Sequence, residues 1–584
     1  MDDAVFRAPE RAALRWVEDF NEALAAGTAR PVGELFEDDG DWRDTVALSW
    51  TLQTTSGREA IATALHRLAM QRGMRAVAID TDRCPARTVR RAGAEVVEAI
   101  LTFETDIGRC TGLLRMKVGS RKAWTLLTAL DSIRGHEEAT LRKARDEAAV
   151  GRAFQGPNWL DRRRAATAYE DRDPAVLIVG GGHGGITAAA RLGQLGIDTL
   201  VVDRMARVGD NWRLRYHGLK LHNTVHSNHM PYLPFPETFP SYIPKDLIAN
   251  WLEFYVDVMA VNFWTRTSFD AAEWDEAAQC WSARLTLADG SNRVMRPRHI
   301  VMATSVSGTP SIPDIPTLDR FKGTVLHSSQ FEDGAAWKNR PVMVFGTGTS
   351  AHDIAQDLQG NGADVTMVQR SPTLVVNVEP SAQFYDGVYH GPGPGLDDRD
   401  LINLSVPLAL LKTAHREITD RVKEIDKPLL DGLEKAGFRL DFGDDGTGWP
   451  LKYRTRGGGY YFNVGCSELI AAGKIDLIQY ADIDCFTANG VAMAAGEDRP
   501  ADLVVLATGY KNQDHMVRLL FGDSVADRAG PVWGYDPDTQ ELRNMWMPTG
   551  QPGLWFTGGA FSQCRIYSKY LALQIQAREL GLVT

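Results

Sequence analysis

The stretch AVLIVGGGHGGITAAARLGQLGIDTLVVDR, residues 175–204, decides the fold of this chain. An apolar run enters a glycine-rich turn, an apolar-faced segment follows, and a second apolar run ends at Asp203. This order is typical of a strand, a turn, a helix and a second parallel strand. We expect Gly180 to permit the tight turn, Gly182 to let the backbone approach a pyrophosphate, and Gly185 to allow close helix packing. With Asp203 placed to accept hydrogen bonds from ribose hydroxyls, the stretch predicts dinucleotide binding.

The same pattern recurs in PVMVFGTGTSAHDIAQDLQGNGADVTMVQRS, residues 341–371. Gly346 and Gly348 occupy the first two glycine positions, and Ala351 replaces the third glycine, which is a known variant of the pattern. The second strand ends in an amide and Arg370, where an NAD enzyme would carry an acid. A guanidinium suits a 2′-phosphate, so Arg370 favours NADPH as the coenzyme. The alternative is that Arg370 is a surface residue that binds no ligand.

Length and composition limit the remaining possibilities. The chain has 584 residues, with 64 Lys and Arg against 75 Asp and Glu and a net charge of −11. That length predicts about four structural units, and the acidic balance argues against nucleic acid or an anionic membrane surface as partner. The six cysteines lie far apart without a C-x-x-C pair, which argues against a disulfide framework, a zinc site and a redox dithiol and favours the cytoplasm. We expect neither a signal peptide nor a membrane span.

The N-terminal part reads as a separate α+β domain over residues 1–135. Trp16, Phe20 and Leu24 have helical spacing, and LFEDDGDW and SGREAIATALHRL alternate short helices with turn signals. AEVVEAILTFETD, RCTGLLRMKV and AWTLLTALDSI then predict three successive strands. Residues 136–174 predict a linker that begins with a charged helix in HEEATLRKARDEAA. The lone His66 carries no predicted chemistry.

Four histidines, at positions 217, 222, 226 and 229, raise the question of a metal site. Their spacing fits no zinc pattern, no cysteine or clustered carboxylate completes a ligand set, and HMPYLPFPETFP behind them reads as a Pro-rich loop. We therefore expect no metal.

Several further motifs lie around the two dinucleotide folds. FKGTVLHSSQF, residues 321–331, precedes the second fold, and ADLVVLATGY, residues 501–510, predicts a buried strand. MATSVSGTP, residues 302–310, is a similar element after the first fold. The C-terminal stretch from GLWFTGG onward predicts a strand, Gly558 and Gly559, and a helix whose N-terminus returns to the first fold.

These motifs resemble those of the class B flavin monooxygenases, the flavin-containing and Baeyer–Villiger enzymes. Gly209, Asp210, Asn211 and Trp212 occupy a G-G-x-W-like motif whose second glycine is replaced, and FKGTVLHSSQF is similar to the family signature F-x-G-x-x-x-H-x-x-x-[YFW]. The resemblance implies FAD in the first fold and NADPH in the second. The N-terminal part resembles a nuclear transport factor 2-like (SnoaL-like) cone, which points to the type II flavin-containing monooxygenases and leaves acceptance of NADH open.

The resemblance also implies site residues. Asn211, Trp212 and the stretch LHNT would lie near the flavin ring, with His222 or Asn223 close to its reactive edge. His327 would set the orientation of the two domains, and direct proton chemistry by His327 is the less favoured alternative. The expected catalytic positions are His327, His222 and Asn223. The expected cofactor-binding residues are Gly180, Gly182, Gly185, Asp203, Arg204, Asn211, Trp212, Thr304, Gly346, Gly348, Ser350, Ala351, Arg370, Thr508, Gly558, Gly559 and Arg565.

The predicted fold class is α/β, with two Rossmann-like domains for FAD and NADP behind an α+β cone. We assign residues 175–335 and 500–584 to the FAD domain and residues 336–499 to the NADP domain. We expect an insert at about 377–459 to supply much of the substrate pocket. Its aromatic residues either pack in the core or a loop or bind substrate, and the sequence favours neither role; they are Tyr385, Tyr389, Trp449 and Tyr453.

The implied function is monooxygenation of a small organic substrate by dioxygen through a peroxyflavin, with Baeyer–Villiger oxidation of a ketone favoured. Oxygenation of sulfur or nitrogen and an uncoupled NADPH oxidase are the alternatives. A flavin disulfide reductase would need a redox-active cysteine pair near the flavin. The sequence has no such pair, which argues against this alternative. The N-terminal domain is the expected surface for a homodimer.

Overall fold

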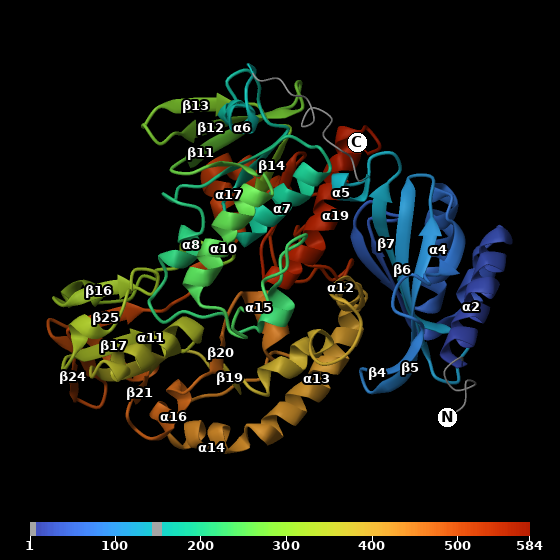
Figure 1. Cartoon of the computed structure of the whole chain (residues 1–584). Helices are drawn as coiled ribbons and strands as arrows, with labels where there is room; N and C mark the ends of the chain where they lie inside the picture. Colours follow the sequence, from blue (N-terminus) through green and yellow to red (C-terminus); the bar gives the residue numbers. More distant parts are fainter. Residues whose placement is uncertain (1–7, 143–154, 584) are drawn as a thin grey trace.

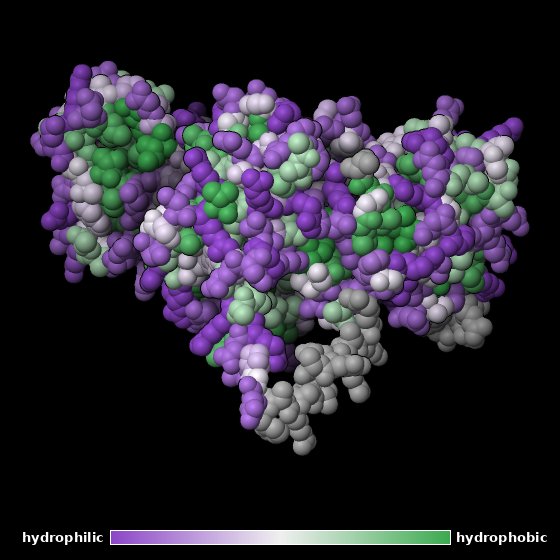
Figure 2. Space-filling model, turned by 90° about the horizontal axis from the view of Figure 1, so that it is seen from above, coloured by the Kyte–Doolittle hydropathy of each residue, from purple (hydrophilic) through white to green (hydrophobic). Residues whose placement is uncertain are grey.

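The computed structural model describes residues 8–142 and 155–583 and divides the chain into three domains and an insert. An N-terminal domain, blue in Figure 1, lies beside helices α12 (Leu396–Leu404) and α19 (Phe561–Glu579). Two further domains are each built on a five-stranded sheet. From above, the surface is mainly hydrophilic, with hydrophobic residues in separate patches (Figure 2). Within the described ranges, no helix combines the length and hydropathy needed to cross a bilayer.

The N-terminal domain packs three helices against a seven-stranded sheet of order β2-β1-β7-β6-β5-β3, with β4 paired to β5. The three predicted successive strands are confirmed as β5, β6 and β7, and the SGREAIATALHRL helix is confirmed as α4. The elements are α2 (Ala8–Ala25), α3 (Ala29–Glu34), β1 (Phe36–Thr45), β2 (Leu52–Ser56), α4 (Arg58–Arg72), β3 (Arg75–Ile79), β4 (Arg87–Arg91), β5 (Ala94–Glu104), β6 (Gly108–Lys117) and β7 (Ala123–Ile133).

The expectation of short helices and turns around LFEDDGDW is wrong, because this segment forms strand β1. Strand β1 pairs in parallel with β7 and antiparallel with β2. Its Asp44 is fully buried and accepts hydrogen bonds from the amides of Leu48 and Ser49 and from the Thr128 hydroxyl. Acids and glycine resemble a turn in sequence, but pairing with β2 and β7 holds the segment in the sheet, and the Asp44 that follows it is satisfied by two local amides and by Thr128 of β7.

The predicted linker is packed against the first dinucleotide domain over part of its length. Helix α5 (Ala139–Arg142) covers part of the predicted charged helix, and the rest of that prediction from residue 143 lies outside the described residues. Helix α6 (Trp159–Ala168) begins at Asn158, which forms a capping box with Asp161. The following Tyr169 is fully buried, and its hydroxyl donates to Asp198. The Tyr169 contact attaches the end of the linker to the first dinucleotide domain.

The first dinucleotide domain confirms the predicted strand, turn, helix and strand. Its sheet has the order β10-β9-β8-β14-β27, and every pairing is parallel. Two of the strands come from distant parts of the sequence, so the C-terminal stretch returns to this domain as predicted. The elements are β8 (Val176–Val179), α7 (His183–Gln194), β9 (Thr199–Val202), α8 (Asp210–Arg213), α9 (Val225–Asn228), α10 (Lys245–Val258), β10 (Asn262–Trp264), β14 (His299–Met302), α17 (Gln513–Phe521), α18 (Asp523–Ala529) and β27 (Leu554–Phe556); β11 (Ser268–Asp275), β12 (Cys280–Thr286) and β13 (Asn292–Met295) form a side sheet.

The second dinucleotide domain has a parallel sheet of order β16-β25-β17-β18-β21. Strands β16 (Thr324–His327) and β25 (Leu503–Leu506) belong to it because β25 pairs with both β16 and β17. This corrects the expected boundaries at 335 and 500, which assigned both strands to the first domain. The other elements are β17 (Pro341–Phe345), α11 (Thr349–Gly360), β18 (Asp364–Gln369) and β21 (Asp476–Gln479), with β22 (Ile483–Thr487), β23 (Gly490–Met493) and β24 (Asp498–Pro500) in a side sheet.

The insert forms an arc of helices that reaches from the second domain to the N-terminal domain (Figure 1). A two-stranded sheet of β19 (Leu374–Asn377) and β20 (Tyr460–Asn463) closes its base. Its helices are η4 (Ala382–Tyr389), α12, α13 (Leu408–Ile425), α14 (Lys427–Lys435), α15 (Gly448–Arg456) and α16 (Cys466–Ala471). Strands β15 (Thr309–Pro310) and β26 (Tyr510–Lys511) pair where the chain crosses between the dinucleotide domains.

Candidate functional site

One cavity of about 1370 Å³ joins the two glycine-rich turns. It lies at the carboxyl ends of the parallel strands, where open α/β sheets bind their ligands. A drug-sized ligand occupies a pocket of about 300–1000 Å³, so this cavity has room for more than one such group. Its wall includes Gly180 and Gly182 of the first turn, Gly346 and Gly348 of the second, and side chains of the insert.

The first turn has the geometry that its glycines predict. Gly180 has φ +110°, and a Cβ there would lie 2.5 Å from the carbonyl oxygen of Ala303. A Cβ on Gly185 would lie 2.1 Å from the carbonyl oxygen of Gly180, so the helix and the turn are in direct contact. Gly182 precedes the first residue of α7 and lines the cavity. The turn therefore leaves the helix N-terminus open to an anion.

The strand after the first turn ends with Asp203, which lines the cavity. Its Oδ2 accepts a hydrogen bond of 2.6 Å from the Gly181 amide, and its Oδ1 accepts one from the Met205 amide. These bonds hold the carboxylate in place beside the turn, where a carboxylate can still accept further donors. The next residue, Arg204, is exposed at the edge of the cavity.

The second turn repeats this arrangement with two differences. Gly346 has φ +118°, and a Cβ there would lie 2.4 Å from the carbonyl oxygen of Ala507. The third position holds Ala351, which is fully buried and accommodated. Arg370 lines the cavity with an exposed side chain. Ser350 lies at the same wall.

Polar atoms without partners face this cavity. Trp212 Nε1, Arg215 Nε, Thr304 Oγ1 and Tyr510 Oη are buried, lie on residues of the wall and have no hydrogen-bond partner among the described residues. Buried polar groups normally find a partner, so these atoms fit a polar ligand. Asn211 also lines the cavity, and its amide lies close to Gly182.

The N-terminus of α19 closes the first turn from the far side. Gly558 and Gly559 line the cavity, and Gly559 has φ +101°. The ring of His183, on the first residue of α7, makes a 2.8 Å hydrogen bond to the carbonyl oxygen of Gly559 and stacks on Phe561. His183 was not identified from the sequence, although it occupies a variable position of the glycine motif.

Arg565 differs from the expectation that it binds a cofactor. Its guanidinium forms a two-pronged ion pair with Asp400, with both distances at 2.6 Å. It also donates to the carbonyl oxygens of Ser227 and His229. Because Arg565 is 3% exposed and its donors are engaged by protein groups, its contacts are structural ones between α12, α19 and α9.

His327 lies at the crossing between the dinucleotide domains. One ring nitrogen, Nε2, lies 3.1 Å from the carbonyl oxygen of Gly509, and Nδ1 accepts from the Ser329 amide. This pattern requires the neutral ring with its proton on Nε2, and burial lowers the pKa of His327. The neighbouring residues Ser328 and Ser329 form part of the cavity wall. Thr508, on the same crossing, lines the cavity and donates to the carbonyl oxygen of Ser311.

His222 and Asn223 line the cavity opposite the insert. The ring of His222 lies edge-on to Phe462 at 4.7 Å, and burial lowers its pKa to about 4, so it is neutral at pH 7. The Nδ2 of Asn223 donates a 2.7 Å hydrogen bond to Oδ2 of Asp386. Burial raises the pKa of Asp386, against the bond from Asn223 and the charge of Arg454.

The insert contributes much of the remaining wall, including two residues that the sequence did not single out, Asp386 and Arg454. Within the described part of the chain, the Arg454 guanidinium donates a hydrogen bond to the hydroxyl of Tyr535. Of the four aromatic residues left open between packing and binding, three line the cavity, whereas Tyr389 bonds to Asp400. The three are Tyr385, Trp449 and Tyr453.

Comparison with known proteins identifies the family. Residues 174–385 match the model of the pyridine nucleotide-disulphide oxidoreductases. The indole-3-pyruvate monooxygenase YUCCA1 of Oryza sativa subsp. japonica is 29% identical over 60% of this chain and 80% of its own. The probable indole-3-pyruvate monooxygenase YUCCA4 of Arabidopsis thaliana is 30% identical over 58% of this chain and 76% of its own. This chain belongs to the class B flavin-dependent monooxygenases.

Solved structures of this monooxygenase family share the fold. The open form of cyclohexanone monooxygenase covers 70% of this chain and 89% of its own, with a TM-score of 0.52 and 18% identity. Cyclohexanone monooxygenase from Rhodococcus sp. Phi1 bound to NADP⁺ covers 70% and 85%, with a TM-score of 0.50 and 17% identity.

The enzyme is an FAD- and NADPH-dependent monooxygenase, and its cavity fits both cofactors. Two helix N-termini, each behind a glycine-rich turn, suit two pyrophosphates. The unpartnered polar atoms on Trp212 and Thr304 could donate to a flavin, and Arg370 places a cation beside the second turn. The six cysteines are free thiols at scattered positions.

Proposed function

We propose that this monooxygenase inserts one oxygen atom next to the carbonyl of a small ketone, a Baeyer–Villiger oxidation. The observation that carries the proposal is the guanidinium of Arg454, which lies at the cavity and, among the described residues, hydrogen-bonds to a phenol hydroxyl rather than to a carboxylate. A cation in a low-dielectric site stabilises negative charge on a carbonyl oxygen as it develops. Oxygen transfer to a thioether or an amine develops no such charge on the substrate.

The residues around Arg454 support the same chemistry. Asp386 accepts from Nδ2 of Asn223, and a carboxylate at that position fixes which way the amide points. His222 is neutral and packed against aromatic rings, so we assign it to shaping the cavity rather than to moving a proton. Bound FAD, reduced by NADPH, supplies the activation of dioxygen.

We assign FAD to the first turn and NADPH to the second. Gly180, Gly182 and Gly185 would cradle the FAD pyrophosphate, with Asp203 on the ribose. Gly346, Gly348 and Ala351 would do the same for NADPH, with Arg370 on the 2′-phosphate. His327 would hold the crossing between the two domains through the carbonyl of Gly509. The other proposed contacts are Arg204, Asn211, Trp212, Thr304, Ser350, Thr508, Gly558 and Gly559.

The wall suggests an aromatic or cyclic ketone as the first substrate. Tyr385, Trp449, Tyr453 and Tyr460 line one side of the cavity, and aromatic side chains bind flat apolar groups well. The relatives named as indole-3-pyruvate monooxygenases take an aromatic 2-oxo acid by name. Aryl ketones, cyclic ketones and aromatic 2-oxo acids are therefore the panel to test.

Product analysis tests this proposal. The enzyme is incubated with NADPH, air, the ketone panel and a matched set of thioethers, and organic products and hydrogen peroxide are measured together. Lactones or esters, or decarboxylated acids from the 2-oxo acids, support the proposal. Sulfoxides alone would move the assignment to heteroatom oxygenation, and peroxide without any organic product would mean an NADPH oxidase.

A pair of variants separates a specific role of Arg454 from the loss of any one positive charge at the cavity. We expect Arg454→Met to lower ketone turnover by about 100-fold, the scale for removing one stabilising donor, and to leave thioether oxygenation nearly unchanged. Arg456→Met is the control, because Arg456 also lines the cavity but is exposed and paired with Asp444. Equal losses on both substrate classes would contradict the proposed role.

We further propose that the N-terminal domain is a nuclear transport factor 2-like cone. The support is a sheet of long strands β5, β6 and β7 with α2 and α4 packed against it. Circular dichroism of the isolated domain, residues 1–135, would test whether this unit folds alone, and an unfolded spectrum would contradict it.

A further inference from the structure

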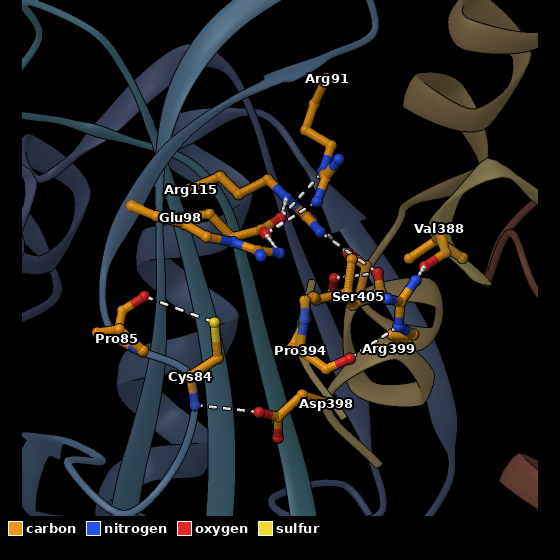
Figure 3. A network of polar contacts seen from close by, with 12 residues as sticks. Cys84, Pro85, Arg91, Glu98, Arg115, Val388, Pro394, Asp398, Arg399 and Ser405 are labelled. Carbon is orange, nitrogen blue, oxygen red and sulfur yellow. Dashed lines mark hydrogen bonds and ion pairs between the residues drawn. The ribbon is translucent and has the colours of Figure 1, made fainter. Parts of the chain in front are cut away.

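The N-terminal domain forms hydrogen bonds and an ion pair with both ends of helix α12 of the insert. At the start of α12, Arg83 pairs with Asp398 at 2.6 Å, and the Cys84 amide donates to the other oxygen of that carboxylate at 3.0 Å. At its end, Arg115 donates to the carbonyl oxygens of Ile402 and Ser405. Figure 3 shows Arg115 reaching from the N-terminal sheet to this segment.

Arg115 is held for this contact by a buried charge cluster. Its side chain is fully buried on β6, and its Nε donates to Glu98 on β5 at 2.9 Å. Arg87 and Arg91 bind the same carboxylate. Burial would raise the pKa of Glu98, but the three arginines lower it to about 2. Glu98 is therefore charged, and it fixes the guanidinium plane of Arg115 (Figure 3).

The charges of this cluster match the end of the helix that they face. Three arginines surround one carboxylate, which leaves an excess of positive charge. The last carbonyls of a helix are unpaired acceptors at its negative end. A second arginine, Arg43 on β1, donates to the carbonyl oxygen of Leu404 and is itself paired with Glu541. Two buried arginines thus cap one helix C-terminus from another domain.

Helix α12 connects these contacts of the N-terminal domain to the cavity. Its Asn403 lines the cavity, and its Asp400 holds Arg565 of α19 at 2.6 Å. Arg565 donates to the carbonyls of Ser227 and His229 on either side of Asn228. The Nδ2 of Asn228 then donates to the carbonyl oxygen of Asn223 at 2.9 Å. Each step of this path is a hydrogen bond, except along helix α12 and along the backbone of residues 227–229, which joins the two carbonyls to Asn228.

We propose that Arg115 is a positioning residue for oxygen transfer, acting through α12 on the backbone of Asn223 and on the cavity wall at Asn403. The N-terminal domain then has a catalytic consequence without contributing a group to the reacting atoms. The inference rests on the oxygenation site proposed above and is independent of whether the substrate is a ketone.

The test uses the full-length enzyme with FAD bound and compares three variants. Arg115→Met keeps the side-chain volume and removes both contacts to α12. Arg115→Lys keeps the charge beside Glu98 but cannot bridge two carbonyls in the same way. Arg91→Met is the matched control, since Arg91 makes two bonds to Glu98 and, within the described residues, hydrogen-bonds to no residue of α12.

Coupling is the readout that a purely structural role would not move. We expect Arg115→Met to raise the fraction of NADPH oxidation that ends as hydrogen peroxide by about tenfold, with FAD content and the rate of flavin reduction unchanged. Arg115→Lys should lie between this variant and the wild type, and Arg91→Met should match the wild type. Wild-type coupling in folded Arg115→Met, or equal leakage in Arg91→Met, would overturn the proposal.

A second probe covers the case in which Arg115→Met does not fold. Hydrogen–deuterium exchange in Arg115→Lys should rise in residues 396–405 and 223–229 and stay at wild-type level in helix α11. Unchanged exchange in both segments would contradict the path. Peroxide release in the presence of a thioether gives the same comparison if ketones are not substrates, so the two proposals fail separately.

Discussion

The two glycine-rich turns share their first contact and differ in their third. Gly180 and Gly346 both have positive φ, and each would bring a Cβ within 2.5 Å of a carbonyl oxygen of the adjacent strand end. Gly185 touches the carbonyl of its own turn, whereas the equivalent Ala351 carries its methyl group in a buried site. The first turn is therefore packed more tightly on its helix than the second.

The ends of the second strands differ in charge. Asp203 and Arg204 follow β9, whereas Gln369 is the last residue of β18 and Arg370 follows it. The Asp203 carboxylate would repel a 2′-phosphate and suits free ribose hydroxyls. Gln369 is buried and uses its amide on the Arg439 backbone, which leaves Arg370 without an adjacent acid. In the proposed assignment, the difference between Asp203 and Gln369 at this one position favours FAD at the first turn and NADPH at the second.

The largest effect is expected from Gly185→Ala, which tests the tighter packing of the first turn. The added methyl group would lie 2.1 Å from a backbone oxygen that cannot move away. We expect a loss of more than about 3 kcal/mol in the free energy of unfolding and protein without FAD. Ala351→Gly is the control and should cost about 1 kcal/mol. Thermal unfolding and flavin absorbance measure both, and yellow, stable Gly185→Ala protein would refute this reading.

A pH effect should distinguish the two helices that follow the turns. On α11, Asp353 accepts a 2.6 Å hydrogen bond from Tyr216 of the other domain, and burial raises its pKa from 3.8 to about 6; α7 carries Thr187 at the equivalent place. The folded state therefore holds this proton more tightly than the unfolded chain. The stabilising contribution is full below pH 4 and is lost as the pH rises through 6, by on the order of 3 kcal/mol.

Denaturant titrations between pH 4 and 8 check this effect. Asp353→Asn should flatten the decline, whereas Asp364→Asn, an exposed position on β18, should keep it. The same decline in both variants would assign it to another group.

Coenzyme choice tests the charge difference between the strand ends. Arg370→Ala should weaken NADPH by about 1.5–3 kcal/mol, the scale of a hydrogen bond to a charged group, and leave NADH nearly unchanged. Arg204→Ala, at the matching position of the first turn, should change neither Michaelis constant. Equal losses for NADPH and NADH in Arg370→Ala would mean that the specificity lies elsewhere.

The smallest effect concerns the crossing between the two turns. His327→Ala removes the hydrogen bond to the Gly509 carbonyl, worth about 1 kcal/mol, together with the local bonds between Nδ1 and Ser329. We expect flavin reduction to persist and peroxide release to rise about fivefold. His217→Ala, at an exposed histidine, is the comparison and should behave as wild type. Loss of flavin reduction with intact coupling would give His327 a different role.

The sequence alone was sufficient for the parts that depend on neighbours along the chain. Both turns, their helices and the strands before and after them follow from glycine spacing and apolar runs within about 30 residues. Gly180, Gly182, Gly346, Gly348 and Arg370 reach the same cavity as expected. Local geometry at a turn is set by the residues that form it, so the pattern is readable without the fold.

Tertiary structure decided the rest. LFEDDGDW forms a strand because it pairs with β2 and with the distant β7, and Arg565 does not line the cavity because it is engaged by Asp400. Asp386 and Arg454 carry no motif and reach the site from an insert that folds back on the first domain. The cap of α12 by Arg115 joins residues almost 290 positions apart. Such contacts depend on which surfaces meet in space, and no local pattern in the chain encodes that.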